Sequence, residues 1–464
     1  MSESQDVKRK VLLAANVSYV LVILDSSVVN VALPTIKSEL MLDVFSLQWV
    51  VNAYLLLFAS LLLSGGALCD RYGSKVIYIS GLSFFALASL ICGASSGSVS
   101  LLSGRILQGI TAAVLVPGSL SLITHTFKDK SERTQAIASW ASWGGVALVF
   151  GPIVGGWMTE YLSWRSIFLI NIPLCLLGIF LACPVSLMDE GEKSTSFDVK
   201  GQLLLFFIFL ITLSCVMRVS KENHLDRYST LSFLIVLLLV YFFVLIERKT
   251  KNPIMPLALF RNSNFRSISW IFFAGAFSFF GSLFILTFWF QDVLHFSAME
   301  TGLLMLPLSL SVIGGNKISG VLSNRYKTSS MMIFGALLRL FGFAGLLATQ
   351  YSHSYYLLIL PMILIGFGGG LGSPMSTSLF MQSVPRKYTG LASGISRATG
   401  QMGSALAVAV FAKMVSSESI FVSNLKYAVL TIILVTFSIV LINIFGVNND
   451  MDTYNSTSSD GAER

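Results

Sequence analysis

The stretch VLLAANVSYVLVILDSSVVNVAL, residues 11–33, decides how this chain folds. As an α-helix it would be about 34 Å long, enough to cross the roughly 30 Å hydrocarbon core of a bilayer. One carboxylate, Asp25, lies about 21 Å into this span. A charge at that depth costs several kcal/mol unless it is paired, hydrated or protonated. Asp25 therefore indicates either a proton or substrate site, or a locally satisfied polar residue that caps a kink near Pro34.

The composition of the whole chain indicates a protein that is solvated by lipid. Hydrophobic residues make up 54% of the 464 positions, charged residues 12%, and the mean hydropathy is +0.77. A soluble domain of this composition would have too little polar surface to cover itself. The net charge of +8 does not indicate a nucleic-acid partner, because the basic residues are not clustered on a soluble module. The five cysteines have no metal-ligand spacing, so we interpret them as packing residues and expect no metal site.

Apolar segments of membrane length recur in an order of six, two and six. A polar stretch at 189–200 follows the first six, and a basic stretch at 248–266 precedes the last six. The predicted spans cover residues 11–33, 49–68, 76–95, 101–124, 136–158, 167–187, 201–217, 231–246, 268–290, 303–322, 331–348, 355–380, 395–415 and 427–445. This order predicts an all-α integral membrane protein with fourteen transmembrane helices.

The same pattern predicts five parts of the chain. They are an N-terminal six-helix bundle over 1–187, a linker with two additional transmembrane helices over 188–247, a basic cytoplasmic loop over 248–266, a C-terminal six-helix bundle over 267–446, and a disordered polar tail over 447–464.

The distribution of Lys and Arg predicts the orientation in the membrane. Counted by this topology, they are about three times as frequent in the loops on the side of the N-terminus as in the opposite loops. Because cytoplasmic loops carry such an excess, both termini are predicted to be cytoplasmic. The loop at 218–227 is basic on the opposite side, so the exact ends of the seventh and eighth spans stay open.

Three short motifs lie inside or between the predicted spans. The first, GALCDRYGSK at 66–75, joins the second and third spans. Its glycine at position 73 permits a positive φ in a short turn, and its basic residues would at least anchor the loop on the cytoplasmic side. The candidate residues of this gating loop are Gly66, Asp70, Arg71, Gly73 and Lys75.

The second motif, Arg105-Ile-Leu-Gln108-Gly109, places another charge inside a span. The fourth span enters from the outside, so Arg105 lies about 6 Å below the outer boundary. Asp25 lies roughly 9 Å below the same boundary. The two charges are therefore predicted at comparable depth.

The third motif is GPIVGG at 151–156, in the fifth span. Gly151 and Gly155 are four residues apart, with Pro152 between them and Gly156 next in sequence. Small residues at this spacing let a membrane helix approach its neighbour closely, and the proline lets it bend.

These motifs resemble those of the major facilitator superfamily. The loop at 66–75 resembles its cytoplasmic loop signature, the Arg105 motif resembles its fourth-helix motif, and 151–156 resembles the antiporter signature of proton-driven exporters. LDSSVVNVALP at 24–34, with Asn30 and Pro34, is similar to the pattern of fourteen-span drug:proton antiporters, which include methylenomycin A resistance proteins and quaternary-ammonium pumps. Trp164-Arg165, Asn171-Ile-Pro173 and Asp198 fit the same family, and the resemblance covers nearly the whole chain.

The resemblance implies two six-helix bundles plus two extra central helices, and a monomer in the bacterial cytoplasmic membrane. It implies proton-coupled efflux of drugs or antibiotics by alternating access. In that reading Arg105 holds Asp25 ionised until a proton or substrate competes. Asp70 acts as a gate latch on a helix N-terminus of the other bundle.

Two positions depart from the family patterns. Ala147 stands where the antiporter pattern often has glycine, which preserves small size. Asn324 stands in the second-half counterpart of the loop motif where an acid would complete it, so a symmetric latch is in doubt.

The charges inside the spans bear on the substrate. Asp25 is the one clear acid there, against Arg105 and Arg339, whereas a pocket for multivalent cations would be expected to have further carboxylates. We therefore expect small lipophilic substrates, neutral or weakly acidic, in preference to divalent cations. Arg339 itself is interpreted either as a substrate contact or as a snorkelling or packing residue.

Other functions have weaker support. The chain has no G-x-x-x-x-G-K-[ST] phosphate loop, so we expect a proton gradient to supply the energy, without a cofactor. An uptake permease of the same fold is an alternative, although the glycines around Pro152 argue against it. A tetracycline or cation:proton antiporter is another alternative. An intramembrane enzyme is the alternative of a different class.

Overall fold

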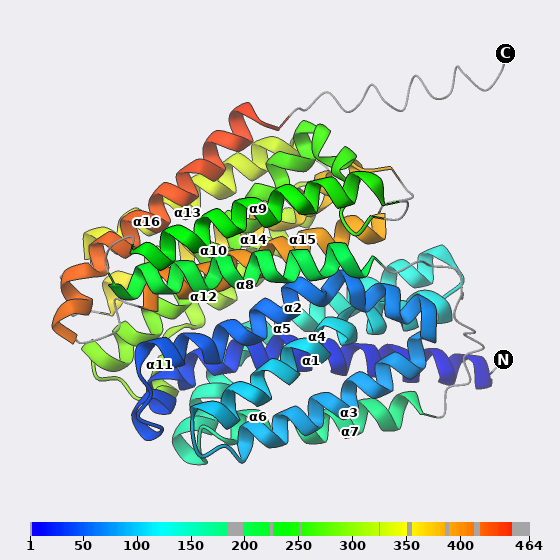
Figure 1. Cartoon of the computed structure of the whole chain (residues 1–464), viewed down its shortest axis with the longest axis horizontal. Helices are drawn as coiled ribbons and strands as arrows, with labels where there is room; N and C mark the ends of the chain where they lie inside the picture. The colour runs from blue at the N-terminus through cyan, green and yellow to red at the C-terminus, as the bar shows by residue number, and fades with distance from the viewer. Residues whose placement is uncertain are drawn as a thin grey trace.

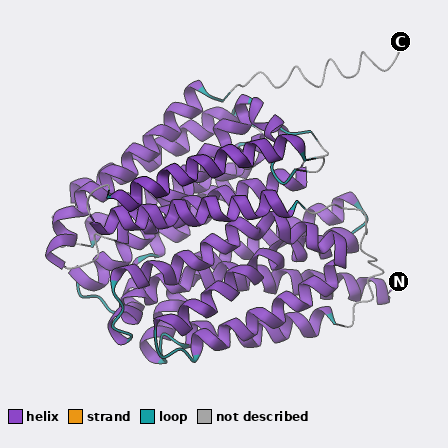
Figure 2. Ribbon diagram, viewed as in Figure 1, coloured by secondary structure: helices purple, strands orange, loops and turns teal. Residues whose placement is uncertain are grey.

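The computed structural model describes residues 2–183, 198–222, 226–250, 253–323, 325–349, 355–385, 389–412 and 418–447. All regular secondary structure in these ranges is helical (Figure 2). The predicted all-α class is therefore confirmed. The polar tail predicted over 447–464 lies, beyond Val447, outside the described residues.

Seven helices from the first part of the chain pack together in the lower half of Figure 1. They are α1 (Ser2–Glu39), α2 (Val44–Tyr72), α3 (Ser74–Gly93), α4 (Ser98–Thr126), α5 (Lys130–Tyr161), α6 (Ser166–Leu169) and α7 (Asn171–Ala182). In this first group α4 packs against α1, α2 and α3, which makes it the central helix.

The last part of the chain forms a second group, most of which lies in the upper half of Figure 1, whereas its short helix over 298–304 lies at the lower left, against the first group. It comprises α10 (Ser263–Phe288), the π-helical turn η2 (Trp289–Val293), α11 (Ala298–Leu304), α12 (Leu306–Leu322), α13 (Thr328–Thr349), α14 (Tyr356–Gln382), α15 (Thr389–Phe411) and α16 (Glu418–Phe445). A short 3₁₀ turn, η1 (Leu257–Arg261), precedes them.

Two further helices, α8 (Val199–Glu222) and α9 (Arg227–Lys249), lie between the groups in the chain. The first of them contacts α2 of the first group and α15 of the second, and α9 packs on α8. Asp226 caps α9, because its carboxylate accepts hydrogen bonds from the hydroxyl and the backbone N–H of Ser229. These bonds lower the pKa of Asp226 to about 2. The cap places the start of the eighth span at Arg227.

The described residues contain 12 helical segments that are long and apolar enough to cross a membrane. The shorter apolar pair α6 and α7, over Ser166–Ala182, lies at the predicted sixth span, and α15 lies at the predicted thirteenth. The helix α15 is less apolar than the others because it contains Arg397 and several Gly and Ser residues. Each of the fourteen predicted spans thus has a helical counterpart.

Several helices continue beyond the apolar spans that the sequence predicts. The first helix begins at Ser2, nine residues before the predicted start, and runs through Pro34 to Glu39. No helix-breaking residue separates its charged start from the apolar run, so hydrogen bonding continues into the polar region. Hydrophobicity locates the part of a helix that lies in lipid, not its ends.

Two predicted spans are each built from two helices. The span predicted at 167–187 is divided at Ile170 into α6 and α7, and its predicted end lies outside the described residues. The span predicted at 303–322 is divided at Met305, two residues before Pro307. Proline has no backbone N–H to bond the carbonyl four residues earlier, so a helix restarts there with proline in its first turn.

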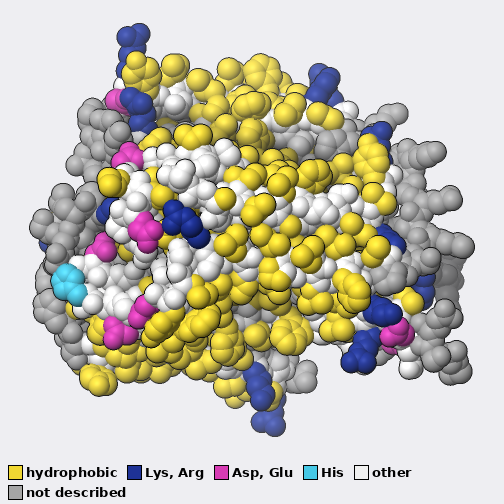
Figure 3. Space-filling view, turned by 90° about the horizontal axis from the view of Figure 1, so that it is seen from below, with side chains coloured by type: hydrophobic (Ala, Val, Ile, Leu, Met, Phe, Trp, Pro, Cys, Tyr) yellow, Lys and Arg dark blue, Asp and Glu magenta, His cyan; other side chains and the backbone are white. Residues whose placement is uncertain are grey.

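The outer face of the molecule is apolar over much of its length. Hydrophobic side chains cover most of the face in Figure 3, and charged side chains lie mainly towards the two ends of the long axis. Large side chains such as Phe84 and Phe233 are more than half exposed, and Phe180 is 74% exposed. Apolar surface of this extent would be unfavourable in water and suits the hydrocarbon of a bilayer.

Candidate functional site

Asp25 of α1 is the centre of a buried polar network. The carboxylate is fully buried, and Arg105 of α4 is 1% exposed. Arg105 Nη1 donates to Asp25 Oδ2 at 2.6 Å. Gln108 Nε2 donates to Asp25 Oδ1 at 3.0 Å, and Asn171 Nδ2 of α7 donates to the same oxygen at 2.8 Å. Two helices, α4 and α7, thus supply three donors to the carboxylate of a third.

The guanidinium of Arg105 is held on several sides. Its Nε donates to the carbonyl of Val50 in α2 at 2.9 Å, and its Nη1 also donates to Gln108 Oε1 at 2.8 Å. The guanidinium carbon lies 4.3 Å from the centre of the Tyr54 ring, within the range of a cation–π contact. Each of these contacts constrains the direction in which Arg105 meets Asp25.

Glycines allow α4 to come close enough to place these side chains. A Cβ at Gly109 would lie 2.7 Å from the carbonyl oxygen of Tyr54, and one at Gly104 would lie 3.0 Å from that of Ala88. Larger residues would therefore push α4 away from α2 and α3. The glycine at 109 predicted as part of the motif has this packing role.

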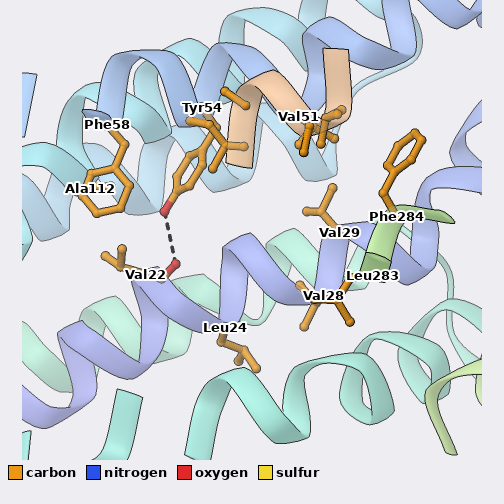
Figure 4. Close-up of a cluster of buried hydrophobic side chains, with 14 of the residues drawn as sticks. Val22, Leu24, Val28, Val29, Val51, Tyr54, Phe58, Ala112, Leu283 and Phe284 are labelled. Carbon is orange, nitrogen blue, oxygen red and sulfur yellow. Dashed lines mark hydrogen bonds between the residues drawn. The ribbon is translucent and has the colours of Figure 1, made fainter. Parts of the chain in front are cut away.

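The surroundings of the network are apolar. In Figure 4 Tyr54 reaches from α2 towards α1, where its hydroxyl donates to the carbonyl of Val22 at 3.1 Å. Figure 4 also shows Leu283 and Phe284 of α10 close to Val28 and Val29 of α1. In such surroundings an unpaired charge is expensive, which makes the partners of Asp25 essential.

The geometry limits how Asp25 can take up a proton. In the structure, Asp25 Oδ2 faces an N–H of Arg105, and Asp25 Oδ1 faces N–H groups of Gln108 and Asn171. A protonated carboxyl group carries its own O–H donor, which cannot point at another donor. Oδ1 already accepts from two donors, whereas Oδ2 accepts from one, so a proton would add to Oδ2, where it would remove the negative charge that attracts Arg105.

Sequence reasoning missed three members of this network. Asn171 was recognised only as part of a family pattern, and Tyr54 and Ser89 were not singled out; Ser89 Oγ accepts from Gln108 Nε2 at 2.9 Å. The available signal was a polar side chain inside an otherwise apolar helix, as Asn171 is in α7. Asn30, which was predicted, instead donates to the carbonyl of Ser26 within α1 at 3.1 Å.

The motif at 151–156 joins α1 to the second group. A Cβ at Gly155 would lie 2.7 Å from the carbonyl oxygen of Val28 in α1, and one at Gly151 would collide with the side chain of Ser27. On another side of α5, a Cβ at Gly156 would collide with the carbonyl of Ala298 in α11. The same helix therefore contacts α1 and α11 at nearly the same height.

Two further contacts stabilise the packing of α5 against α11 near the C-terminal end of α5. A Cβ at Gly302 of α11 would collide with the carbonyl of Pro152. The backbone N–H of Met299 donates to Glu160 Oε2 at 2.9 Å. Further towards the start of α5, a Cβ at Gly145 would meet nothing within 4 Å. These contacts pack the two groups tightly near the C-terminal end of α5, whereas a side chain at Gly145, near the middle of the helix, would have open space.

The predicted gating loop is partly described. Gly73 has φ 87°, the left-handed region that glycine adopts readily, and a Cβ at Gly66 would meet only Pro117, at 3.9 Å. Lys75 Nζ donates to the carbonyl of Cys183 at 2.7 Å. Arg71 lies over the Tyr72 ring, with 5.4 Å between guanidinium carbon and ring centre. The side chain of Asp70, and Asn324, lie outside the described residues.

The structure does not bring Arg339 to the Asp25 network. It lies on α13, in the second group, where its Nη2 donates to the carbonyl of Gly275 at 2.9 Å. Among the described residues no group of three or more His, Cys, Asp or Glu could hold a metal ion. A buried carboxylate that accepts from three donors can bind and release a proton or a polar ligand group.

Comparison with known proteins agrees with the sequence motifs. The profile of the Major Facilitator Superfamily matches residues 15–408. The chain is 30% identical to the methylenomycin A resistance protein of Bacillus subtilis, over 90% of this chain and 90% of that protein. It is 30% identical to the tetracenomycin C resistance and export protein of Streptomyces glaucescens, over 88% of this chain and 76% of that protein.

A solved structure has the same fold at low sequence identity. The nucleoside transporter NupG superposes with a TM-score of 0.67 at 13% identity, and the match covers 95% of this chain and all of that one. At this identity the likeness concerns the fold alone.

The Asp25 and Arg105 pair is expected to show strong thermodynamic coupling. Removing one member of a buried ion pair costs about 3–5 kcal/mol, because the other charge stays buried without its partner. We expect Arg105→Gln to lower the unfolding temperature of the purified protein more than the double variant Asp25→Asn/Arg105→Gln does. Tryptophan fluorescence during a thermal ramp measures this, with the exposed Arg261→Gln as a control. Additive losses in the double variant would show that the two residues are not coupled.

The glycine contact between α5 and α11 is expected to hold these two helices together. Gly156→Val should separate the two helices, since a side chain there has no space against Ala298. Gly145→Val, on the same helix, should have little effect because its Cβ meets nothing. Amide hydrogen exchange of α11 reports the separation, and we expect it to rise in the first variant only. Equal exchange in both variants would contradict the packing argument.

Proposed function

Because this chain belongs to the Major Facilitator Superfamily, we propose that it exports drugs or antibiotics from the cytoplasm in exchange for external protons, by alternating access. It is a multi-pass membrane protein and a transporter related to resistance and export proteins at 30% identity. The proposal places it in the bacterial cytoplasmic membrane with both termini in the cytoplasm, driven by the proton gradient. The observation that carries it is the three-donor network around Asp25.

In the proposed cycle, a proton that reaches Asp25 breaks its contact with Arg105. The carboxyl group then no longer holds α1 to α4, and the two helices can move relative to each other. Ser27 and Val28 follow closely on α1, and they pack against the glycines of α5. A shift of α1 would therefore displace α5. On its other side, α5 contacts α11 of the second group.

This sequence of contacts supports coupling between a proton and the outer closure. Tightly packed helix interfaces have discrete arrangements instead of deforming smoothly, so a small change at one contact can favour another arrangement of the whole interface. The glycines at 151, 155 and 156 supply such an interface on both sides of α5.

The proposal predicts that Asp25→Asn abolishes proton-coupled export but not folding. Everted membrane vesicles with an imposed pH gradient and an internal pH-sensitive dye report proton release when drug is added. Methylenomycin A and tetracenomycin C, named for the relatives, are the first compounds to add. We expect the wild type to release protons and Asp25→Asn to release none. Asp6→Asn, at an exposed carboxylate, is the matched control.

Two outcomes of this experiment would count against the proposal. Normal proton release by Asp25→Asn would remove Asp25 from the coupling. Drug accumulation in right-side-out vesicles, driven by the same gradient, would instead indicate an uptake permease.

We further propose that the loop at 66–75 is the dominant gate latch. The left-handed turn at Gly73 and the bond from Lys75 to Cys183 fix this loop to the end of α7, which supports a constrained position for it. Asp70→Asn is therefore expected to reduce transport severely in the same vesicles, whereas Asn324→Asp should change it little. Similar mild effects at both positions would contradict an asymmetric latch.

A further inference from the structure

A second polar feature of the membrane interior lies in the second group of helices, in a cavity of about 290 Å³. Residues of α10, α12, α13, α14, α15 and α16 line it, and Leu148 of α5 contributes from the first group. Its lining is mainly apolar, with Arg339 and Asn443 among the few polar side chains. The volume is close to the lower limit of pockets for small ligands, roughly 300 Å³.

Glycines from two neighbouring helices make room for the Arg339 side chain. A Cβ at Gly368 of α14 would lie 2.9 Å from Arg339 Cγ, and one at Gly369 would lie 3.8 Å from Cδ. On α10, a Cβ at Gly275 would lie 3.4 Å from Arg339 Nη1. The side chain therefore lies in a channel between α10 and α14 instead of extending towards a membrane surface.

The depth of Arg339 also argues against snorkelling. It lies near the middle of α13, about 15 Å from either end of the helix, which exceeds the reach of an arginine side chain. Its Nη2 donates to the carbonyl of Gly275, but its buried Nε has no hydrogen-bond partner. One N–H donor of the charged Arg339 guanidinium is thus buried without a hydrogen-bond acceptor.

Nothing in the second group neutralises this charge. The sequence has no Asp or Glu between Glu300 and Glu418, and none from 263 to 291. Arg105 in the first group, by contrast, has Asp25 as its counter-ion. An unpaired cation within a membrane is costly, and such residues are kept where they bind something.

A second unused group lines the same cavity. Asn443 of α16 is 3% exposed, and its Oδ1 has no hydrogen-bond partner. The cavity therefore offers a charged donor on one side and a neutral acceptor on another. Ile271, Phe272 and Met332 provide apolar surface between them.

We propose that this cavity binds a lipophilic organic monoanion, with its carboxylate or enolate on Arg339 and its apolar body between α10 and α13. The inference rests on the proposed export function and names the class of substrate for it. A guanidinium matches the planar, two-oxygen geometry of a carboxylate. Asn443 would accept a hydrogen bond from a hydroxyl or amide of the same ligand.

The proposal is tested by binding, without a proton gradient. The probes are 1-naphthaleneacetate and its neutral isostere 1-naphthaleneacetamide, titrated by calorimetry into the purified full-length protein in detergent. We expect the anion to bind at least about 10-fold more tightly than the amide. Arg339→Gln should weaken binding of the anion about 30-fold and leave binding of the amide unchanged.

Three control variants separate the charge from the cavity. Lys317→Gln removes one charge from an exposed position of the same group and should change neither affinity. Arg339→Lys keeps the positive charge but lacks the planar pair of N–H donors that a guanidinium offers to a carboxylate. It should retain part of the preference for the anion. Gly372→Leu, at a lining position where a Cβ meets nothing, fills the cavity and should weaken binding of both probes.

The outcomes are decisive even if Arg339→Gln fails to fold. Equal affinity of the wild type for both probes, or binding of neither, would overturn the proposal. Unchanged binding in Gly372→Leu would place the ligand elsewhere and overturn it too. Because the assay uses no gradient and does not involve Asp25, its result is independent of whether the chain exchanges drug for protons.

Discussion

The ion pair between Asp25 and Arg105 is the interaction on which the rest of the first group depends. Two charges that are both almost completely buried must recover the cost of leaving water through their mutual attraction and their further hydrogen bonds. Gln108, Asn171 and the carbonyl of Val50 supply those bonds. Since they belong to different helices, the pair can exist only when α1, α2, α4 and α7 are all in place.

The need to bring these helices together explains the glycines better than a local turn requirement does. In lipid the hydrophobic effect does not hold apolar helices together, so close packing and interhelical hydrogen bonds must do so. Gly109 brings α4 against α2, and Gly155 brings α5 against α1. Because Gly156 makes the corresponding contact with α11, the packing that holds the ion pair continues across the interface between the two groups.

The sequence was sufficient to predict the helical class, the order of spans and the depth of the central charges. Asp25 and Arg105 were placed at similar depth from helix rise alone, and their side chains meet at 2.6 Å. The contact of Asn171 could not be predicted, because it depends on the rotation of α7 after the break at Ile170. Helix ends were missed for a related reason: the hydropathy signal ends with the lipid, whereas backbone hydrogen bonding continues.

The two groups differ most in how they treat charge inside the membrane. In the first, the carboxylate and the guanidinium satisfy each other, so a proton or a ligand must weaken an existing contact. In the second, Arg339 has no carboxylate partner, so a ligand anion would meet an unused donor. The two sites suit different tasks. Binding at Asp25 competes with a contact between helices, whereas binding at Arg339 does not. In the proposed cycle, Asp25, next to the packing of α1 on α5, is therefore the residue through which binding is converted into movement.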